Sequence, residues 1–504
     1  MKLIFNGELP ADWPADRVAQ VYNALDCGIT HEILTELKPQ LTNQHAHIYE
    51  LTKSFAAPAL EMMLRGVAVD STAMWEHRRR LEREWAEVFD WLQELAFAID
   101  LPLRKPTKAI DQSHRLNPGS PKQLHELFYH VLKLNPIKIF DKKKGEAIPS
   151  TNRESLEKLA ERNRIAAPFV SAILSLRDRA KVLGYLRNVE ADGRMRFSFN
   201  IAGTETGRWS SSKSVWGTGY NAQNIPPAIR EIFIADRGYK LCYLDLEQAE
   251  SRFVGLLAPG VAYWDACHSG DLHTYCCRLI WPGLSWTGDL KKDRPLADTL
   301  FYREYSYRDL SKRGGHGTNY YGKAPTIAKH LHVDRQLIED FQRAYFREFP
   351  EIPAWHLEVK ERLQVDRCLT TPFGRIRWFH GRPDDDATLR EAIAYVPQSS
   401  IADYLNTGLR DVWRRLRNVQ LLLQVHDAIV FQFPEEEEDC IEEVVRTLQI
   451  KISHRGKNLV IPSEPKVGWN WGAFGPNNPD GMVKWKGIGS DSRKRSGLLD
   501  RVLR

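Results

Sequence analysis

The chain has 504 residues, 42% hydrophobic and 27% charged, with a formal net charge of +6; this balance excludes a chain dominated by disorder and predicts several folded domains. No stretch approaches the roughly 20 apolar residues that cross a bilayer, and the start of the chain lacks a signal-peptide pattern, so we expect an intracellular protein without a membrane partner. The mild basic excess permits a polyanionic partner without requiring one, and the seven scattered cysteines do not repeat a paired zinc-site spacing.

The first 190 residues or so are predicted to be mainly helical. Residues 75–99 place apolar side chains at spacings of three and four with charges between them, which predicts a long amphipathic helix. Two more helices are expected to begin at caps, one at Ser120 and one at Ser150 or Thr151. They flank a lysine-rich loop at 141–146, which is interpreted as a solvated turn rather than a phosphate contact.

Strands are predicted only after about residue 193. The segments 194–203 and 239–246 are strand candidates, helix-rich sequence then continues to about residue 365, and the apolar runs of 420–434 follow. A chain that leaves a sheet, makes a helical excursion and returns predicts a discontinuous domain.

Two aspartates stand at unusual places. Asp427 follows His426 between the two apolar runs of 420–434, and Asp245 lies where an apolar strand gives way to an amphipathic helix. Either residue taken alone is better explained as a turn residue or a helix cap. If the sheet brings both together, their repulsion must be relieved by a proton or a divalent metal. Oxygen ligands favour Mg²⁺, and two such ions can activate an attacking oxygen and stabilise a leaving one in phosphoryl transfer.

A third segment has a regular cationic face. Residues Arg308, Lys312, His316 and Tyr320 recur every four positions on a predicted helix, so that they line one face. Two cations at this spacing repel unless an anion lies over them, and a triphosphate would fit. Gly314, Gly315 and Gly317 disfavour a helix interior, which indicates close approach of another chain or a ligand. A solvated basic face is the alternative.

Together these segments resemble the polymerase portion of family A DNA polymerases, the class of bacterial DNA polymerase I and of many phage replicases. The similarity runs in order from about residue 60 to residue 472. Its motifs are TETGRWSSS at 204–212, AQNIP at 222–226, DLEQAESR at 245–252, GDLHT at 270–274, the segment 308–322, TPFGRIR at 371–377, REAIAYVPQSSIADYL at 390–405 and QVHDAIV at 424–430.

The resemblance implies a template-directed DNA polymerase that adds dNTPs to a primer 3′-hydroxyl in replication or repair. Asp245 and Asp427 would hold two Mg²⁺ ions, with the carbonyl of Leu246 as a further ligand. Arg308, Lys312 and His273 would bind the triphosphate, and Lys312 would protonate the leaving pyrophosphate.

Other residues would then contact the sugar, the base pair and the DNA. Glu250 would exclude a ribose 2′-hydroxyl, Tyr320 would close the nascent base pair, and Gln248 and His316 would complete the nucleotide site. Contacts to the primer-template are implied for Arg208, Gln223, Asn224, Arg390, Gln398 and His426.

Four positions depart from the family pattern. His316 replaces the usual Phe or Tyr, Tyr321 intrudes before Gly322, Ala428 replaces an acidic residue, and Ala394 replaces a polar primer-sensing residue. None of these removes the two essential carboxylates.

The implied fold is α+β, a right hand in which a palm with an antiparallel sheet joins a helical thumb and helical fingers. The expected boundaries are 61–190 for the thumb, 191–255 and 390–472 for the palm, and 256–389 for the fingers. Residues 473–504 are interpreted as a flexible basic tail, with a DNA-contacting arm or a partner peptide as the alternatives. The acidic run 435–439 is interpreted as the start of a helix.

Residues 1–60 are expected to be a remnant of an exonuclease domain. Tyr22 and Asp26 resemble the last motif of the 3′-to-5′ proofreading exonuclease, although a helix with one incidental acid is the alternative. Only 21 residues precede Tyr22, too few for the other metal ligands, so no proofreading by this chain is predicted. Either the rest of the exonuclease domain was lost or it is a separate polypeptide, and a processivity factor would also be separate. A phage replicase in the cytoplasm of a bacterium or phage-infected cell is expected.

Two rival classes remain. A single-subunit RNA polymerase shares the two aspartates, but it needs space where Glu250 stands. A non-catalytic primer-template binding factor would have no reason to keep both Asp245 and Asp427.

Overall fold

The computed structural model describes residues 13–99, 115–141, 145–187, 189–214, 217–491 and 493. Its central element is a five-stranded antiparallel sheet in the order β13–β14–β8–β17–β18. The strands are β8 (Tyr239–Leu246), β13 (Gln420–Val425), β14 (Ala428–Pro434), β17 (Ser463–Gly468) and β18 (Val483–Lys484). The middle strand β8 is therefore separated from β13 by more than 170 residues of sequence, as expected for a discontinuous domain.

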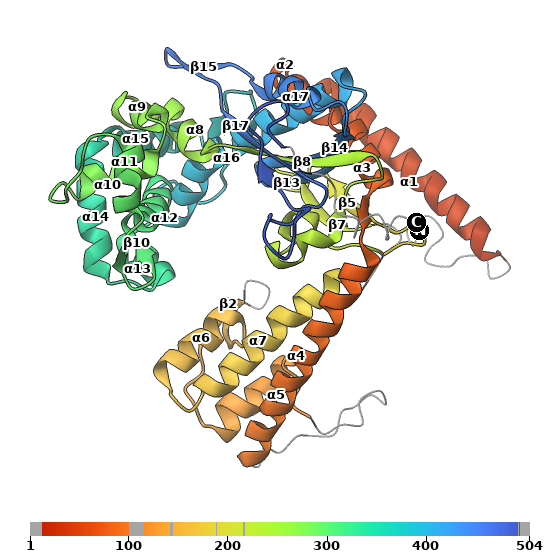
Figure 1. Cartoon of the computed structure of the whole chain (residues 1–504), viewed down its shortest axis with the longest axis vertical. Helices are drawn as coiled ribbons and strands as arrows, with labels where there is room; N and C mark the ends of the chain where they lie inside the picture. Colours follow the sequence, from red (N-terminus) through yellow and green to blue (C-terminus); the bar gives the residue numbers. More distant parts are fainter. Residues whose placement is uncertain are drawn as a thin grey trace.

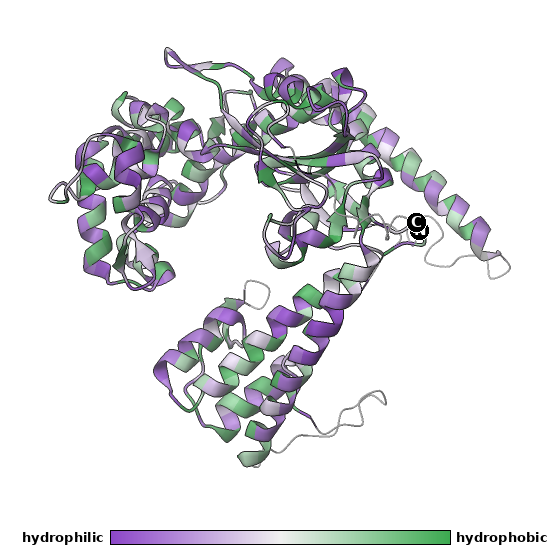
Figure 2. Ribbon diagram, viewed as in Figure 1, coloured by the Kyte–Doolittle hydropathy of each residue, from purple (hydrophilic) through white to green (hydrophobic). Residues whose placement is uncertain are grey.

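Helices α8 (Ala249–Leu257), α16 (Asp386–Arg415) and α17 (Cys440–Leu448) share the apolar cluster of this sheet, and α3 (Ala56–Arg65) packs on β13. The predicted inward residues of α8 are indeed buried: Phe253 and Leu256 have no exposed surface and Leu257 is 5% exposed. Strands β8, β13 and β14 contribute much of the largest apolar cluster, because β14 and β8 carry apolar residues on both faces. Figure 2 shows these strands largely in green. The sheet is thus a rigid support for the residues at its ends.

A helical body lies apart from the sheet at the bottom of Figure 1. It contains α4 (Ser71–Ala98), α5 (Pro121–His125), a π-helical turn at Glu126–Val131, α6 (Arg153–Arg162), α7 (Ala167–Tyr185) and the hairpin β2 (Lys138–Asp141)–β3 (Glu146–Pro149). Helices α4 and α7 pack along each other and share a separate apolar core. The long helix predicted for 75–99 is confirmed.

A second helical body follows α8 in the chain. It contains α9 (Ala262–His268), α10 (Leu272–Ile280), α11 (Leu290–Ala297), the strands β9 (Leu300–Tyr302) and β10 (Tyr305–Ser306), α12 (Tyr307–Asn319), α13 (Ala324–Leu331), α14 (Arg335–Glu348) and α15 (Glu351–Val365). It is built around two further apolar clusters, the larger of which also includes residues of α8 and α16, and it stands to the left of the sheet in Figure 1.

The remaining helices and strands complete the described chain. Helices α1 (Ala15–Leu37), α2 (Asn43–Lys53) and α3 (Ala56–Arg65) precede β1 (Val67–Val69), which pairs with β4 (Arg194–Met195) and β7 (Phe233–Ile234). The remaining pairs are β5 (Phe197–Asn200) with β6 (Ser210–Lys213), β11 (Cys368–Thr370) with β12 (Ile376–Trp378), and β15 (Ile452–His454) with β16 (Lys457–Leu459). Three 3₁₀ turns lie at Lys38–Gln40, Ala222–Asn224 and Pro227–Ile232. No helix in the described part of the chain is both long and apolar enough to span a bilayer.

Several local predictions need correction. Helix α6 is capped by Asn152, whose side chain accepts from the Ser155 amide, and not by Ser150 or Thr151. Helix α12 ends at Asn319, so Tyr320 follows the helix instead of continuing its face. The acidic run 435–439 precedes α17 and does not form its first turn, because that helix begins at Cys440.

The flexible tail predicted after residue 472 is wrong for 473–491. Strand β18 extends the central sheet, and Trp485 donates its indole N–H to Glu438 at 2.6 Å. The Asp491 side chain is only 2% exposed and lies 3.6 Å from the Lys240 ammonium. Apolar contact and a buried ion pair therefore fix this segment; residues 494–504 lie outside the described part.

Candidate active site

The two predicted aspartates meet at one end of the central sheet. In the pairing of β14 with β8, Asp245 lies opposite Ala428, the residue directly after Asp427. The amide of Leu246 also donates to the Asp427 carbonyl at 3.1 Å, which fixes the end of β8 against the hairpin turn. Strand pairing between distant segments thus places both carboxylates side by side.

Strained backbone lies directly before Asp427 and three residues after Asp245. His426 and Gln248 both have φ of 53°, in the left-handed region that side chains other than glycine rarely adopt. His426 is the first residue of a two-residue hairpin turn, where a positive φ matches the twist of the paired strands. Such conformations persist only where the surroundings enforce them. The rigid sheet therefore determines where the turn presents Asp427.

The environment of the pair disfavours two negative charges. Burial and the neighbouring Asp427 raise the pKa of Asp245 to about 6, and burial raises the pKa of Asp427 as well. Glu464 is a cross-strand neighbour of Asp245 and adds further negative charge. A proton or a cation is needed to stabilise the pair near neutral pH.

The donor set fits Mg²⁺. Two carboxylates and the carbonyl of Leu246 offer oxygen ligands only, which suits an ion that keeps waters and takes up substrate phosphate oxygens. Within the described residues, no group of three or more His, Cys, Asp or Glu side chains is arranged to hold a metal ion. Mg²⁺ held by this pair would consequently need oxygens from outside the protein to complete its shell.

A cavity of about 510 Å³ contains both aspartates and most of the predicted nucleotide residues. Besides Asp245 and Asp427 it is lined by Leu246, Gln248, Glu250, His273, Arg308, Lys312 and His316. Ala249, Ser251 and Arg313 complete the lining. The sequence therefore identified nine of these twelve residues.

The cationic wall comes from α12 and α10. Arg308 donates to both carboxylate oxygens of Asp271 at 3.2 and 3.1 Å, so this acid orients the guanidinium. Lys312 has no ion pair with any residue that the structure describes. Burial, followed by the charge of Arg308, lowers the pKa of His273 to about 4, so its imidazole is neutral at neutral pH. Asp271 was not predicted, although it is the acid of the GDLHT motif.

Glu250 is held from two sides. Its Oε1 accepts from Arg208 at 2.9 Å, and its Oε2 lies 3.2 Å from His316 Nδ1 on α12. The same Arg208 nitrogen lies 3.9 Å from Asp427 Oδ1. Arg208 therefore lies beside the carboxylate pair although it does not line the cavity.

Tyr320 lies beside the site but does not line its cavity. Its ring meets the His316 ring edge-on at 4.9 Å, and its hydroxyl is buried without a hydrogen-bond partner among the described residues. Gln248 Oε1 is unsatisfied in the same way. Buried polar atoms of this kind are uncommon in folded proteins and are available to a ligand.

The glycines of α12 serve helix packing rather than a ligand. A Cβ at Gly314 would lie 3.0 Å from Phe341 of α14, and one at Gly317 would lie 2.9 Å from Ile327 of α13. Gly315 faces Tyr345. The predicted close approach is therefore made by neighbouring helices of the same chain.

The predicted DNA contacts are spread over several elements. Gln223 donates to Gln424 on β13, which in turn donates to the His426 carbonyl at 2.6 Å. Asn224 is exposed beside Gln223, Arg390 is exposed near the start of α16, and Gln398 is half-buried further along that helix. Gln424, which connects the 222–224 turn to the hairpin, was missed because it reads as an ordinary strand residue.

Comparison with known proteins agrees with this geometry. The family model of DNA polymerase family A matches residues 92–473, about three quarters of the chain. The chain belongs to DNA polymerase family A. The predicted family and the α+β right-hand fold are thereby confirmed.

Several family A relatives are similar over most of this chain. The thermostable DNA polymerase I of Thermus filiformis is 26% identical over 465 residues, covering 87% of this chain and 50% of the relative. DNA polymerase I of Mycobacterium tuberculosis is 27% identical over 444 residues, covering 80% of this chain and 45% of the relative. The chain thus spans about half the length of these relatives.

A solved structure shares the fold. The POL domain of Pol1 from M. smegmatis, in complex with DNA primer-template and dNTP, superimposes with a TM-score of 0.62 at 25% identity. The alignment covers 83% of this chain and 69% of that domain.

Proposed function

We propose that this chain is a template-directed DNA polymerase that adds deoxyribonucleotides to the 3′-hydroxyl of a primer. The observation that carries the proposal is the single cavity in which two adjoining carboxylates face Arg308, Lys312 and His273. Family membership and the likeness to a domain bound to primer-template and dNTP support it.

Asp245, Asp427 and the Leu246 carbonyl would hold two Mg²⁺ ions. When bound, such ions lower the pKa of the attacking hydroxyl and stabilise the charge on the leaving oxygen. The raised pKa of both aspartates supports this role: burial raises both pKa values, Asp427 adds to the rise at Asp245, and a nearby divalent cation would favour the charged form of each carboxyl.

Arg308, Lys312 and His273 would bind the triphosphate. Asp271 holds the Arg308 guanidinium in one orientation, so less side-chain entropy is lost when a phosphate binds. Lys312 Nζ, which has no competing ion pair in the described chain, would donate a proton to the leaving pyrophosphate. His273 would act as a neutral hydrogen-bonding group, consistent with its low pKa.

Glu250 would select the sugar. Arg208 and His316 restrain its two oxygens separately, so the carboxylate cannot easily turn away from a ribose 2′-hydroxyl. Gln248, His316 and Tyr320 would surround the sugar and base of the same nucleotide.

The primer-template would lie across Arg208, Gln223, Asn224, Arg390, Gln398 and His426. Minor-groove acceptors are common to all correct base pairs, so polar contacts there test the shape of the pair rather than its sequence. Thumb, palm and fingers would correspond to 61–190, 191–255 with 390–472, and 256–389.

Primer extension with Mg²⁺ tests the proposal. We expect Asp245→Asn and Asp427→Asn each to reduce extension by at least about a thousandfold, since each removes a metal ligand. The matched control is Asp366→Asn, a substitution at an exposed residue at the C-terminal end of α15. Undiminished extension by either active-site variant would refute the two-metal assignment.

We further propose that this chain synthesises DNA without a proofreading site of its own. It would act in the cytoplasm of a bacterium or phage-infected cell, and any exonuclease or processivity factor would be a separate polypeptide. Tyr22, predicted to belong to an exonuclease motif, lies 48% exposed on α1, and Asp26 is exposed on the same helix. Degradation of a mismatched primer by the purified chain, absent with Asp26→Asn, would contradict the proposal.

A further inference from the structure

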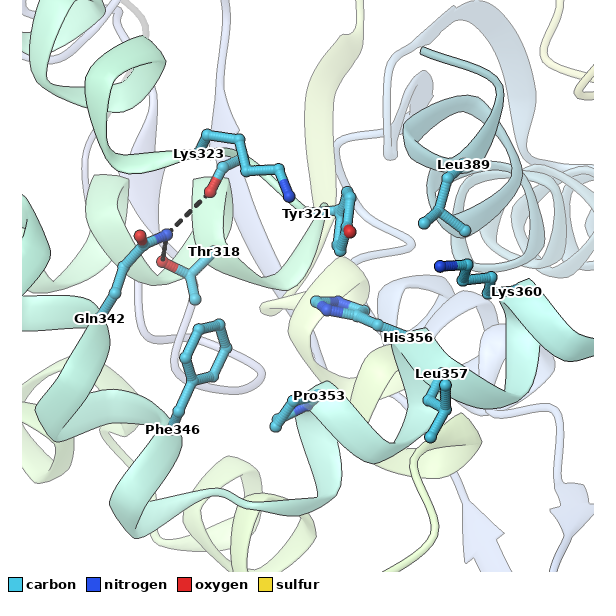
Figure 3. Close-up of a pocket in the computed structure, with 11 residues that line it drawn as sticks. Thr318, Tyr321, Lys323, Gln342, Phe346, Pro353, His356, Leu357, Lys360 and Leu389 are labelled. Atoms are coloured by element: carbon cyan, nitrogen blue, oxygen red, sulfur yellow. Dashed lines mark hydrogen bonds between the residues drawn. The ribbon is translucent and has the colours of Figure 1, made fainter. Parts of the chain in front are cut away.

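Helix α1 differs from the other long helices of the described chain because little packs against it. A cavity of about 310 Å³ between α14, α15 and the loop after α12 shows the contrast, since Gln342 on its wall donates to Thr318 at 3.2 Å and to the Gly322 carbonyl at 2.8 Å (Figure 3). Helix α1 instead extends from the body of the molecule in Figure 1. None of its residues belongs to an apolar cluster of the described chain.

One face of α1 is nevertheless apolar. Six side chains at spacings of three and four form a stripe along it: Val18, Val21, Tyr22, Leu25, Ile29 and Ile33. Tyr22 is 48% exposed, Ile29 47% and Ile33 53%. A continuous apolar stripe in water favours a partner that covers it. A helix without a packed face is only marginally stable by itself, so the same partner would stabilise α1.

Negative charge surrounds this stripe. With His31 neutral, α1 has a net charge of −3, from one arginine, Arg17, and four acids, Asp16, Asp26, Glu32 and Glu36. Asp26 and Glu32 lie three residues before and after Ile29, one on each side of the stripe. None of the four carboxylates forms an ion pair with a residue that the structure describes. The face therefore suits an apolar segment with basic residues beside it.

The same charges disfavour two other partners. A second copy of α1 would bring two helices of like charge together, and the phosphates of DNA would meet the same carboxylates. Neither arrangement would offset the charge on this helix.

Residues 494–504, with the sequence KRSGLLDRVLR, have the complementary pattern. Four basic residues and one acid give this segment a net charge of +3. Its apolar residues recur at spacings of three and four, as on one face of a helix, and are Leu498, Leu499, Val502 and Leu503. Asp500, Arg501 and Arg504 fall on the other side of that pattern. Charge and apolar spacing therefore both match α1.

The segment is long enough to run along α1. Arg493, the last described residue, lies over the Trp469 ring, and Trp469 packs with Ile234 of β7. Figure 1 shows α1 to the right of β7. The eleven residues that follow Arg493 span up to about 36 Å when extended, comparable with the length of about 35 Å expected for the 23 residues of α1.

We propose that residues 494–504 dock on the apolar face of α1 in the same chain. Their leucine and valine side chains cover the stripe, and their basic side chains lie beside Asp26, Glu32 and Glu36. The proposal does not depend on the polymerase function. It assigns the basic segment to a contact within the protein and not to DNA.

Hydrogen–deuterium exchange of the α1 amides tests the contact. The 504-residue chain is compared with a chain that ends at Arg493, without DNA and at several protein concentrations. A synthetic peptide of residues 494–504 is then added to the shortened chain. We expect the amides between Val18 and Ile33 to exchange at least about tenfold more slowly in the full chain, and the peptide to restore this protection.

Binding of the fluorescein-labelled peptide to the shortened chain, followed by anisotropy, tests the face itself. Ile29→Gln should weaken binding by at least about tenfold, because one apolar side chain of the contact is lost. Leu34→Gln is the matched control, since Leu34 is 40% exposed on the same helix but lies off the stripe, and it should leave binding unchanged. Glu32→Gln should weaken binding and reduce its salt dependence. Circular dichroism of each variant verifies that the helix is retained.

Four results would overturn the proposal. Two are equal exchange of α1 in the full and shortened chains, and equal peptide binding by Ile29→Gln and Leu34→Gln. Protection that disappears on dilution would assign the segment to α1 of a second copy of the chain. Weaker binding of duplex DNA by the shortened chain, with α1 exchange unchanged, would make the segment a DNA-contacting arm.

Discussion

Replacing Asp245 by asparagine is expected to stabilise the metal-free protein while it abolishes primer extension. The pKa of Asp245 rises from an ordinary value of 3.8 to about 6 through burial and the nearby Asp427. The folded state therefore holds this proton more tightly than the unfolded state. Stability is full below pH 3.8 and is lost as the pH rises through about 6.

The size of the effect follows from the shift. A rise of about two units in the pKa of Asp245 corresponds to about 3 kcal/mol of lost stability once its carboxyl group is fully ionised. Asparagine has a similar volume and no charge, so Asp245→Asn removes this cost. We expect the variant to unfold with a free energy about 3 kcal/mol higher than wild type at pH 8 in EDTA, and with little difference at pH 4.

Urea denaturation at both pH values, with and without Mg²⁺, measures the difference. Mg²⁺ should stabilise wild type at pH 8 by binding only its folded state, and should narrow the gap to the variant. Asp366→Asn, an exposed substitution far from the pair in sequence, controls for loss of a surface charge. Equal stability of wild type and Asp245→Asn at pH 8 in EDTA would refute the reasoning.

Three other outcomes are expected. Glu250→Ala should lower the preference for dNTPs over rNTPs at least about tenfold in single-nucleotide incorporation; an unchanged preference would count against the sugar gate. Arg375→Met should lower the free energy of unfolding in urea by about 3–5 kcal/mol, because Asp403 is 0% exposed and loses its two hydrogen bonds from Arg375, at 3.0 and 2.7 Å. Arg455→Met breaks the half-exposed ion pair with Glu358 and should lower it by less than about 1 kcal/mol. Burial lowers the pKa of His356 to about 4, so stability should fall by up to about 3 kcal/mol as the pH drops from 6.5 toward 4; His356→Gln should show a smaller fall, and equal acid sensitivity of both proteins would contradict this.

The positions of motif residues were predicted well where the local sequence determines a single helix or strand. In the two runs around Asp427, apolar and polar residues alternate too little for half-exposed strands, and β13 and β14 are buried except at their outer ends. The spacing of four also placed Arg308, Lys312 and His316 on one face of α12. Tyr320 escaped that pattern because the helix ends one residue earlier.

Residues that act through a distant partner were not found. Asp271 orients Arg308, and Gln424 connects the 222–224 turn to His426, but neither relation leaves a trace in local sequence. The glycines of α12 were noticed for the right reason, close approach, yet the approaching groups are Phe341 and Ile327 of neighbouring helices. Such contacts depend on packing between elements that are far apart along the chain.

The sequence by itself determined the family, the order of the motifs and the chemical types of the candidate site residues, because short-range patterns of charge and apolar spacing encode them. Only the tertiary structure decided that Asp427 lies beside Asp245, that Arg208 and His316 share Glu250, and that 473–491 join the sheet. Each of these depends on strand register or on packing between separate elements, which the free energy of the whole fold selects and no local pattern records.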